Sequence, residues 1–126
     1  MPLDLTRPVD AGEIFWIEYP PQTDNSEQYG RRPYIVMSRR LLNSGNTIVV
    51  VPMSTKISKA SDHKVLIPVA EIIKEVGVTW DVQTSVALCN QVRVVDKRKV
   101  ENRIGRLSQN AVLAVQLGLA YLFDLR

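Results

Sequence analysis

The sequence predicts a mostly β domain with helices, of the α+β class, in which the strands come first and a helix comes last. Two observations support this prediction. Short runs of β-branched and aromatic residues, separated by turn-forming residues, recur from Ile14 to Val95. After Ser108 the apolar residues take a helical spacing, which predicts a C-terminal helix over residues 109–123. No repeat, low-complexity tract or linker interrupts the 126 residues, so we expect a single domain.

The first predicted strand covers residues 14–19, with the sequence IFWIEY. A polar loop over residues 20–31 follows, and its length and composition favour a mobile, functional loop. Two near-continuously apolar strands come next, at residues 33–38 and 47–52, with turn-forming residues at 43–46 between them. We therefore expect these two strands to be antiparallel neighbours that are buried on both faces.

The elements expected after residue 55 are short, apart from the final helix. They are a basic loop (56–64), a strand (65–69), one or two helical turns (70–76) that end at Gly77, two strands (85–89 and 91–95) with a bend at Asn90, a helical turn capped by Asp96 (97–99), a strand (104–107) and the final helix, capped by Ser108.

The net charge of +3 is distributed unevenly along the chain. Residues 1–30 carry six acidic side chains against one arginine, whereas residues 31–64 carry seven Lys or Arg against Asp62 alone. A basic middle favours an anionic partner.

Cysteine and histidine usage excludes several kinds of site. Cys89 is the one cysteine, so the sequence predicts no internal disulfide and no zinc site, and a reducing cytoplasm is the expected location. The N-terminal extension, residues 1–11, has no signal-peptide pattern, and no apolar run is long enough to span a membrane. His63 is the one histidine, which excludes two-histidine ribonuclease chemistry, and the acidic residues have no metal-binding spacing. We expect no cofactor and no metal.

Arg32, at the junction of the polar loop and an apolar strand, is the best candidate for a functional side chain. A proline follows it and restricts Arg32 to extended backbone angles, so the charge has a fixed position. Its guanidinium presents a fork of donors suited to phosphate oxygens. Ser54 and Thr55 end the next strand, and an antiparallel arrangement places them beside Arg32. With Lys56 and Lys59 close in sequence, these residues predict a phosphate site.

Four ordered motifs extend this pattern over the chain from Gly12 onward. They are GEIFW at 12–16, SEQ at 26–28 with Gly30 and Arg32-Pro33, VPMST at 51–55, and NQVR at 90–93 with Asp96-Lys97. On these motifs the chain resembles the MazF/PemK family of toxins, which are endoribonucleases of toxin–antitoxin pairs. The resemblance implies a small SH3-like β-barrel of the MazF/CcdB type and a homodimer. It also implies metal-independent, sequence-specific cutting of single-stranded RNA or mRNA, and a groove blocked by a short acidic antitoxin segment.

The resemblance assigns roles by position. Arg32 corresponds to the catalytic arginine, and Ser54 stands where the family usually has its catalytic threonine, with Thr55 directly after, so either hydroxyl is a candidate. Asn90 stands where many members carry an acid, so the general base is unassigned. Glu27 is one candidate for that base, or a loop anchor. The expected RNA-binding residues are Arg31, Gln28, Lys56, Lys59, Asn90, Gln91 and Arg93.

The expected reaction is attack of a 2′-hydroxyl on the adjacent phosphate, which leaves a 2′,3′-cyclic phosphate and a 5′-hydroxyl. The loop 20–31 is then a flap over the active site. Two alternatives stay open: a toxin or binding module of the same fold that inhibits a protein target, as CcdB toxins do, and a catalytically weakened relative that binds RNA. A groove that accepts RNA would also accept an acidic, disordered antitoxin peptide that folds on binding.

Overall fold

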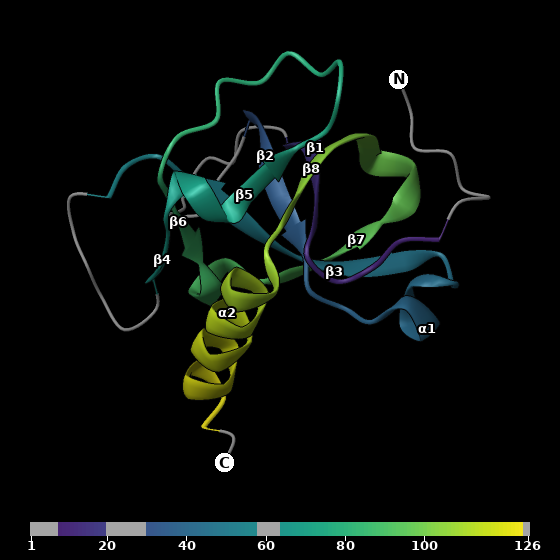
Figure 1. Ribbon diagram of the computed structural model, residues 1–126. Helices are drawn as coiled ribbons and strands as arrows, with labels where there is room; N and C mark the ends of the chain where they lie inside the picture. Colours follow the sequence, from purple (N-terminus) through teal and green to yellow (C-terminus); the bar gives the residue numbers. More distant parts are fainter. Residues whose placement is uncertain (1–7, 20–29, 58–63, 125–126) are drawn as a thin grey trace.

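The strands form one antiparallel sheet in the computed structural model, which describes residues 8–19, 30–57 and 64–124. The strands of this part of the chain are β1 (Glu13–Tyr19), β2 (Gly30–Val36), β3 (Thr47–Ser54), β4 (Lys64–Ile67), β5 (Ile72–Lys74), β6 (Ser85–Leu88), β7 (Arg93–Asp96) and β8 (Val100–Leu107). Their order is β4-β6-β3-β2-β1-β8-β5, and β7 pairs with β3. With the C-terminal helix α2 (Gln109–Leu122) they form the half-barrel shown in Figure 1, which confirms the predicted mostly β fold.

Strand β3 is central because it pairs with three other strands. It pairs with β2, with Tyr34 opposite Pro52. Its first four residues pair with β7, whereas Met53 and Ser54 pair with β6. The consecutive residues from Val50 to Met53 are buried. The predicted antiparallel pair is therefore confirmed, and β3 is buried on both faces as expected.

Alternating side chains build a separate core on each face of the sheet. Ile14, Ile35 and Val51 pack on the face that α2 covers, in one cluster with Val115 of the helix. We call this the helix face. The intervening residues of the same strands build the second core on the opposite face, which we call the second face; its members include Phe15, Ile17, Tyr34, Val36, Ile48 and Val50.

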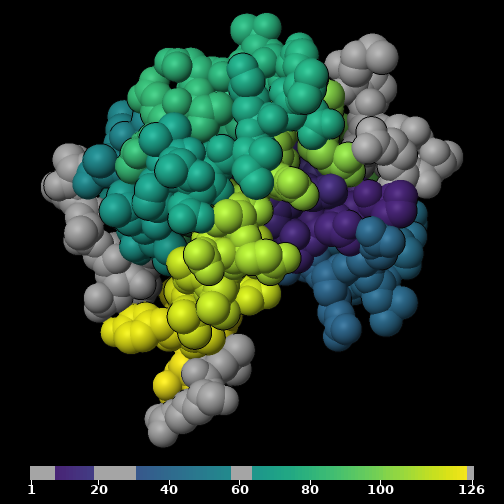
Figure 2. All heavy atoms as spheres, in the orientation of Figure 1, coloured from purple at the N-terminus to yellow at the C-terminus, as the bar shows by residue number. Residues whose placement is uncertain are grey.

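Helix α2 begins where the sequence predicts. The Ser108 hydroxyl accepts a hydrogen bond from the Ala111 backbone N–H at 3.1 Å, which satisfies one free donor of the first turn. Gly118 allows a close approach, because a Cβ there would lie 2.5 Å from Cγ2 of Val65 in β4. Figures 1 and 2 show the helix, in yellow, beneath the teal strands β4 and β5. Within the described residues, neither α-helix has the length and apolar character needed to cross a membrane.

The helical turns predicted at residues 70–76 are wrong beyond the first two residues. A single 3-10 turn, η1 (Val69–Glu71), leads directly into β5, in which Ile72 pairs opposite Leu107 of β8. Burial of Ile72 and pairing along β8 outweigh the local helix preference. Gly77 does have a positive φ of 81°, but it lies in a turn after a strand rather than at a helix end.

Three other local predictions can be compared with the structure. The bend at Asn90 is confirmed as the 3-10 turn η2 (Cys89–Gln91). The Asp96 cap is confirmed, since its carboxylate accepts from the Arg98 N–H at 2.8 Å ahead of η3 (Lys97–Lys99). Strand β8 begins four residues earlier than the predicted strand at 104–107, and the short helix α1 (Arg40–Asn43) was not predicted.

Candidate functional site

Arg32 and Ser54 line the same two hollows at one end of the sheet. The β2–β3 pairing ends with Tyr34 opposite Pro52, and its register, extended by two residues, would place Arg32 across from Ser54. Side chains at directly opposed positions share a face, with Cβ atoms about 5 Å apart. Both residues are partly exposed. The structure therefore brings Arg32 close to Ser54, as the sequence predicts.

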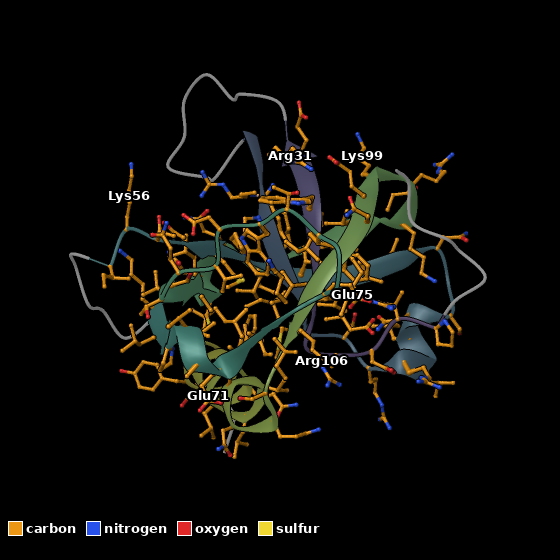
Figure 3. The ribbon with its side chains drawn as sticks, turned by 45° about the horizontal axis from the view of Figure 1, so that its top comes forward. Arg31, Lys56, Glu71, Glu75, Lys99 and Arg106 are labelled. Carbon is orange, nitrogen blue, oxygen red and sulfur yellow. The ribbon has the colours of Figure 1, made fainter. Side chains whose placement is uncertain are left out.

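Two hollows meet at this end of the sheet, and Arg32, Ser54 and Lys56 line both of them. We call these three residues the shared edge. The large hollow has a volume of about 450 Å³ and the small hollow about 220 Å³. Figure 3 shows Lys56 extending outward just after β3. A guanidinium, an ammonium and a hydroxyl between two hollows can hold a phosphate whose neighbouring nucleotides occupy either side.

The structure distinguishes the two candidate hydroxyls. Side chains alternate along a strand, so Ser54, the last residue of β3, lies on the face of Ile48 and Val50. Arg32 shares this face through Tyr34 and Val36, whereas Thr55 lies beyond the strand. Ser54 lines both hollows, whereas Thr55 lines the large one. The Ser54 Oγ also accepts from the Lys56 backbone N–H at 3.1 Å, which holds the chain at the end of β3. Ser54 is thus the hydroxyl that lines both hollows with Arg32.

Arg31 lies on the helix face, next to Arg32 in sequence but directed to the other side of β2. Its Nε donates to Oε1 of Glu101 at 3.2 Å, and its guanidinium carbon lies 4.3 Å from the centroid of the Trp16 ring. Figure 3 shows it at the end of β2. The ion pair with Glu101 and the cation–π contact hold Arg31 against Trp16, so the Arg31 charge is partly neutralised there.

The small hollow is lined by two residues of η2 that the sequence predicts to bind RNA. Asn90 and Gln91 line it together with the shared edge, Leu88 and Lys64. Lys64 begins β4, opposite Leu88 of β6, and sequence reasoning did not select it as a site residue. Three cations and no carboxylate are present among the described residues of this hollow, which therefore favours an anion.

Of the other predicted site residues, one lies away from the site and three lie outside the described residues. Arg93 begins β7, opposite Val50, and lines neither hollow. Glu27, Gln28 and Lys59 lie outside the described residues, as does most of the predicted loop 20–31. The structure therefore leaves the general base unassigned.

Sequence reasoning missed most of the large hollow. Trp16 of β1 lines it together with Trp80, Asp81 and Gln83 from the segment between β5 and β6. Nothing in the sequence connects Trp80 with Trp16. The two rings make an edge-to-face contact with centroids 6.3 Å apart, which only the folded chain creates.

Cys89 does not offer a nucleophile at this site. It is fully buried, and burial raises the pKa of its thiol to about 11. The thiol therefore stays protonated at neutral pH. Among the described residues, no three His, Cys, Asp or Glu side chains are grouped so that they could hold a metal ion.

Comparison with solved structures finds the same fold in other proteins. The chain matches the solved structure of MazF from Deinococcus radiodurans with a TM-score of 0.70 and 24% identity, covering 94% of this chain and 99% of that one. It matches a MazE–MazF complex of the same organism with a TM-score of 0.69 and 22% identity over 95% and 100% of the two chains. It also matches an endoribonuclease from a mycobacterial species, with a TM-score of 0.67 and 12% identity over 94% of each chain.

A search of curated protein sequences found no match. The model of one protein family, described as the PemK-like, MazF-like toxins of type II toxin–antitoxin systems, matches residues 10–123. Because that match covers both central strands, the shared edge and α2, the chain belongs to the PemK-like, MazF-like toxin family.

Proposed function

We propose that this toxin is an endoribonuclease that cuts single-stranded RNA without a metal ion. The observation that carries the proposal is that Arg32 and Ser54, from neighbouring strands, line the same two hollows at one end of the sheet. A solved structure of the same fold is described as an endoribonuclease, which supports the reaction class.

In the proposed reaction the 2′-oxygen of one nucleotide attacks the phosphorus that follows it. The P–O5′ bond breaks, the proton of the 2′-hydroxyl is lost, and the 5′-oxygen takes up a proton. The products are a 2′,3′-cyclic phosphate and a 5′-hydroxyl, so neither water nor a redox partner is consumed.

Arg32 acts where negative charge develops. Its guanidinium donates hydrogen bonds to the non-bridging oxygens as the phosphorus becomes five-coordinate, and one such donor contributes roughly 10²–10³ in rate. Ser54 donates a further hydrogen bond to the same phosphate from the neighbouring strand. The amide of Asn90 cannot take the 2′-proton, and Glu27 remains a candidate for that role.

The small hollow holds the RNA backbone beside the cleaved phosphate. Lys64 and Lys56 supply positive charge, and Asn90 and Gln91 supply donors and acceptors for a splayed nucleotide. Single-stranded RNA suits this arrangement because its bases are free to leave the stack.

We further propose a homodimer and an antitoxin partner. Solved relatives of this fold include MazE–MazF complexes. An acidic antitoxin segment fits the cationic small hollow, where it would compete with RNA for the shared edge. Antitoxin added before RNA is then expected to abolish cleavage.

Cleavage of a defined RNA in excess chelator tests the proposal. The pure protein is expected to cut a long RNA, leaving cyclic phosphate and 5′-hydroxyl ends. A single 2′-deoxy substitution at the cut position should block cutting there and nowhere else. Loss of cutting on chelation, or cutting at the 2′-deoxy position, would contradict the mechanism.

A further inference from the structure

The large hollow contains a carboxylate where an RNA groove would be expected to carry only cations and neutral groups. Asp81 lines it together with the shared edge, and comes from the segment between β5 and β6 that forms the long arch in Figure 1. A phosphate at this position would be repelled, and so would an acidic antitoxin segment. A neutral group that donates hydrogen bonds, such as a nucleobase edge, would be attracted.

The walls of the large hollow suit a flat aromatic ring. Trp16 and Trp80 meet edge to face, with an interplanar angle of 69°, so together they form a corner rather than a closed stack. Trp16 is held from one side by Arg31, and Trp80 packs close to Gly105. A base that leaves the RNA stack gains roughly 1–3 kcal/mol from one aromatic side chain.

The polar side of the hollow is preorganised. The Gln83 Nε2 donates to Oδ2 of Asp81 at 2.8 Å, which orients the carboxylate; each carboxylate oxygen can accept a further hydrogen bond, so both stay available to a ligand. The Ser85 hydroxyl donates to the Gln83 carbonyl at 2.8 Å, and Thr84 Oγ1 accepts from the Val69 N–H at 3.0 Å. These bonds anchor residues 83–85 at the start of β6, and Gln83 in turn orients the exposed Asp81 carboxylate toward the hollow's polar side.

We propose that the large hollow is a nucleobase pocket that selects guanine, an inference that rests on the proposed ribonuclease function. A carboxylate accepts two hydrogen bonds side by side, and guanine presents two adjacent donors, N1–H and the exocyclic amine, on its Watson–Crick edge. Adenine and cytosine place an acceptor beside their amine, and uracil has a single donor between two acceptors. Asp81 is the residue that discriminates, and Trp16 and Trp80 supply stacking.

The chain provides its own reporter for this pocket. It has two tryptophans, and both line the large hollow. Intrinsic tryptophan fluorescence therefore reports binding here without any need for cleavage. The probes are 2′-O-methyl trinucleotides, which lack the attacking hydroxyl, with guanine, inosine, adenine, cytosine or uracil in the middle position.

The guanine trinucleotide is expected to bind roughly tenfold or more tightly than the adenine, cytosine and uracil ones, as one bidentate pair would give. Inosine, which lacks the exocyclic amine, should lose most of that advantage. Asp81→Asn should remove the preference, because an amide places a donor against a donor. The matched control Asp124→Asn, beyond the end of α2, should keep it.

Equal affinity for all five trinucleotides, or a guanine preference that survives in Asp81→Asn, would overturn the proposal. Quenching by an acidic peptide but by none of the trinucleotides would also overturn it, in favour of a protein partner. Guanine-selective quenching by a protein that cuts no RNA would support the pocket and count against the proposed ribonuclease. The two proposals therefore fail separately.

Discussion

Removal of the Glu13 carboxylate is expected to destabilise the fold far more than removal of the Asp10 carboxylate, although both pair with an arginine. Glu13 Oε1 accepts from Arg103 Nη2 at 3.1 Å and from the Asp10 backbone N–H at 2.9 Å. The side chains of this pair are only 16% and 14% exposed. Asp10 pairs with Arg40 at the shorter distances of 2.6 and 2.7 Å, but those side chains are 43% and 63% exposed.

The magnitude follows from burial rather than from distance. Removing one partner of a buried pair costs about 3–5 kcal/mol because the other charge is left uncompensated. Since the Glu13–Arg103 pair retains some solvent contact, we expect about 2–4 kcal/mol for Glu13→Ala. In a domain of this size that loss lowers Tm by roughly 10 °C. Asp10→Ala keeps the backbone N–H that Glu13 uses and breaks only an exposed pair, so its effect should be less than half as large.

Urea unfolding followed by circular dichroism measures both variants under the same conditions. Glu13→Gln serves as a further variant, because it keeps an acceptor for the Asp10 N–H and removes only the charge. It should lie between wild type and Glu13→Ala. An Asp10→Ala variant that loses as much stability as Glu13→Ala would refute the reasoning from burial.

Three further predictions concern the core and the turns. Gly105→Ala should cost roughly 1–3 kcal/mol in urea unfolding, because a Cβ there would lie 2.6 Å from the Ile73 carbonyl oxygen; an unchanged midpoint would count against this contact. The Cys89 thiol, whose pKa burial raises to about 11, should react with a thiol reagent at pH 8 only as the protein unfolds, so rapid labelling of the native protein would contradict its burial. Hydrogen bonds from Arg98 lower the pKa of Asp96 to about 2, below its ordinary 3.8. The stability contributed by this carboxylate is thus complete above about pH 4 and lost as the pH falls towards 2, so the Tm difference between wild type and Asp96→Ala should shrink over that interval. A constant difference would argue against this assignment.

The central strands could be predicted from the sequence because their signals are local. β-branched runs mark β2 and β3, and the turn-forming residues between them imply an antiparallel pair. That inference alone brought Arg32 next to the end of β3. The sequence could not decide between Ser54 and Thr55, because the choice depends on the register of the two strands. The observed pairing of Tyr34 with Pro52 fixes that register.

The elements that sequence reasoning missed depend on distant partners. Residues 72–74 form a strand because they pair with β8, and no local pattern within these three residues predicts a strand. The large hollow also depends on distant partners, since Trp16 and Asp81 are far apart in sequence and line one hollow only in the folded chain. Asp81 carried no local signal, because a single exposed acid in a polar loop resembles any other.

The adjacent arginines allow the most direct test of the central claim. Arg31 and Arg32 are chemically identical neighbours on opposite faces of β2, and only Arg32 lies at the shared edge beside Ser54. Cleavage of one long RNA in excess chelator is compared for wild type, Arg31→Ala and Arg32→Ala. The Arg32 variant is expected to lose roughly 10²–10³ in rate. The Arg31 variant should lose less than about tenfold, because its charge is held by Glu101 and Trp16. Equal losses in the two variants, or full activity in Arg32→Ala, would contradict the account.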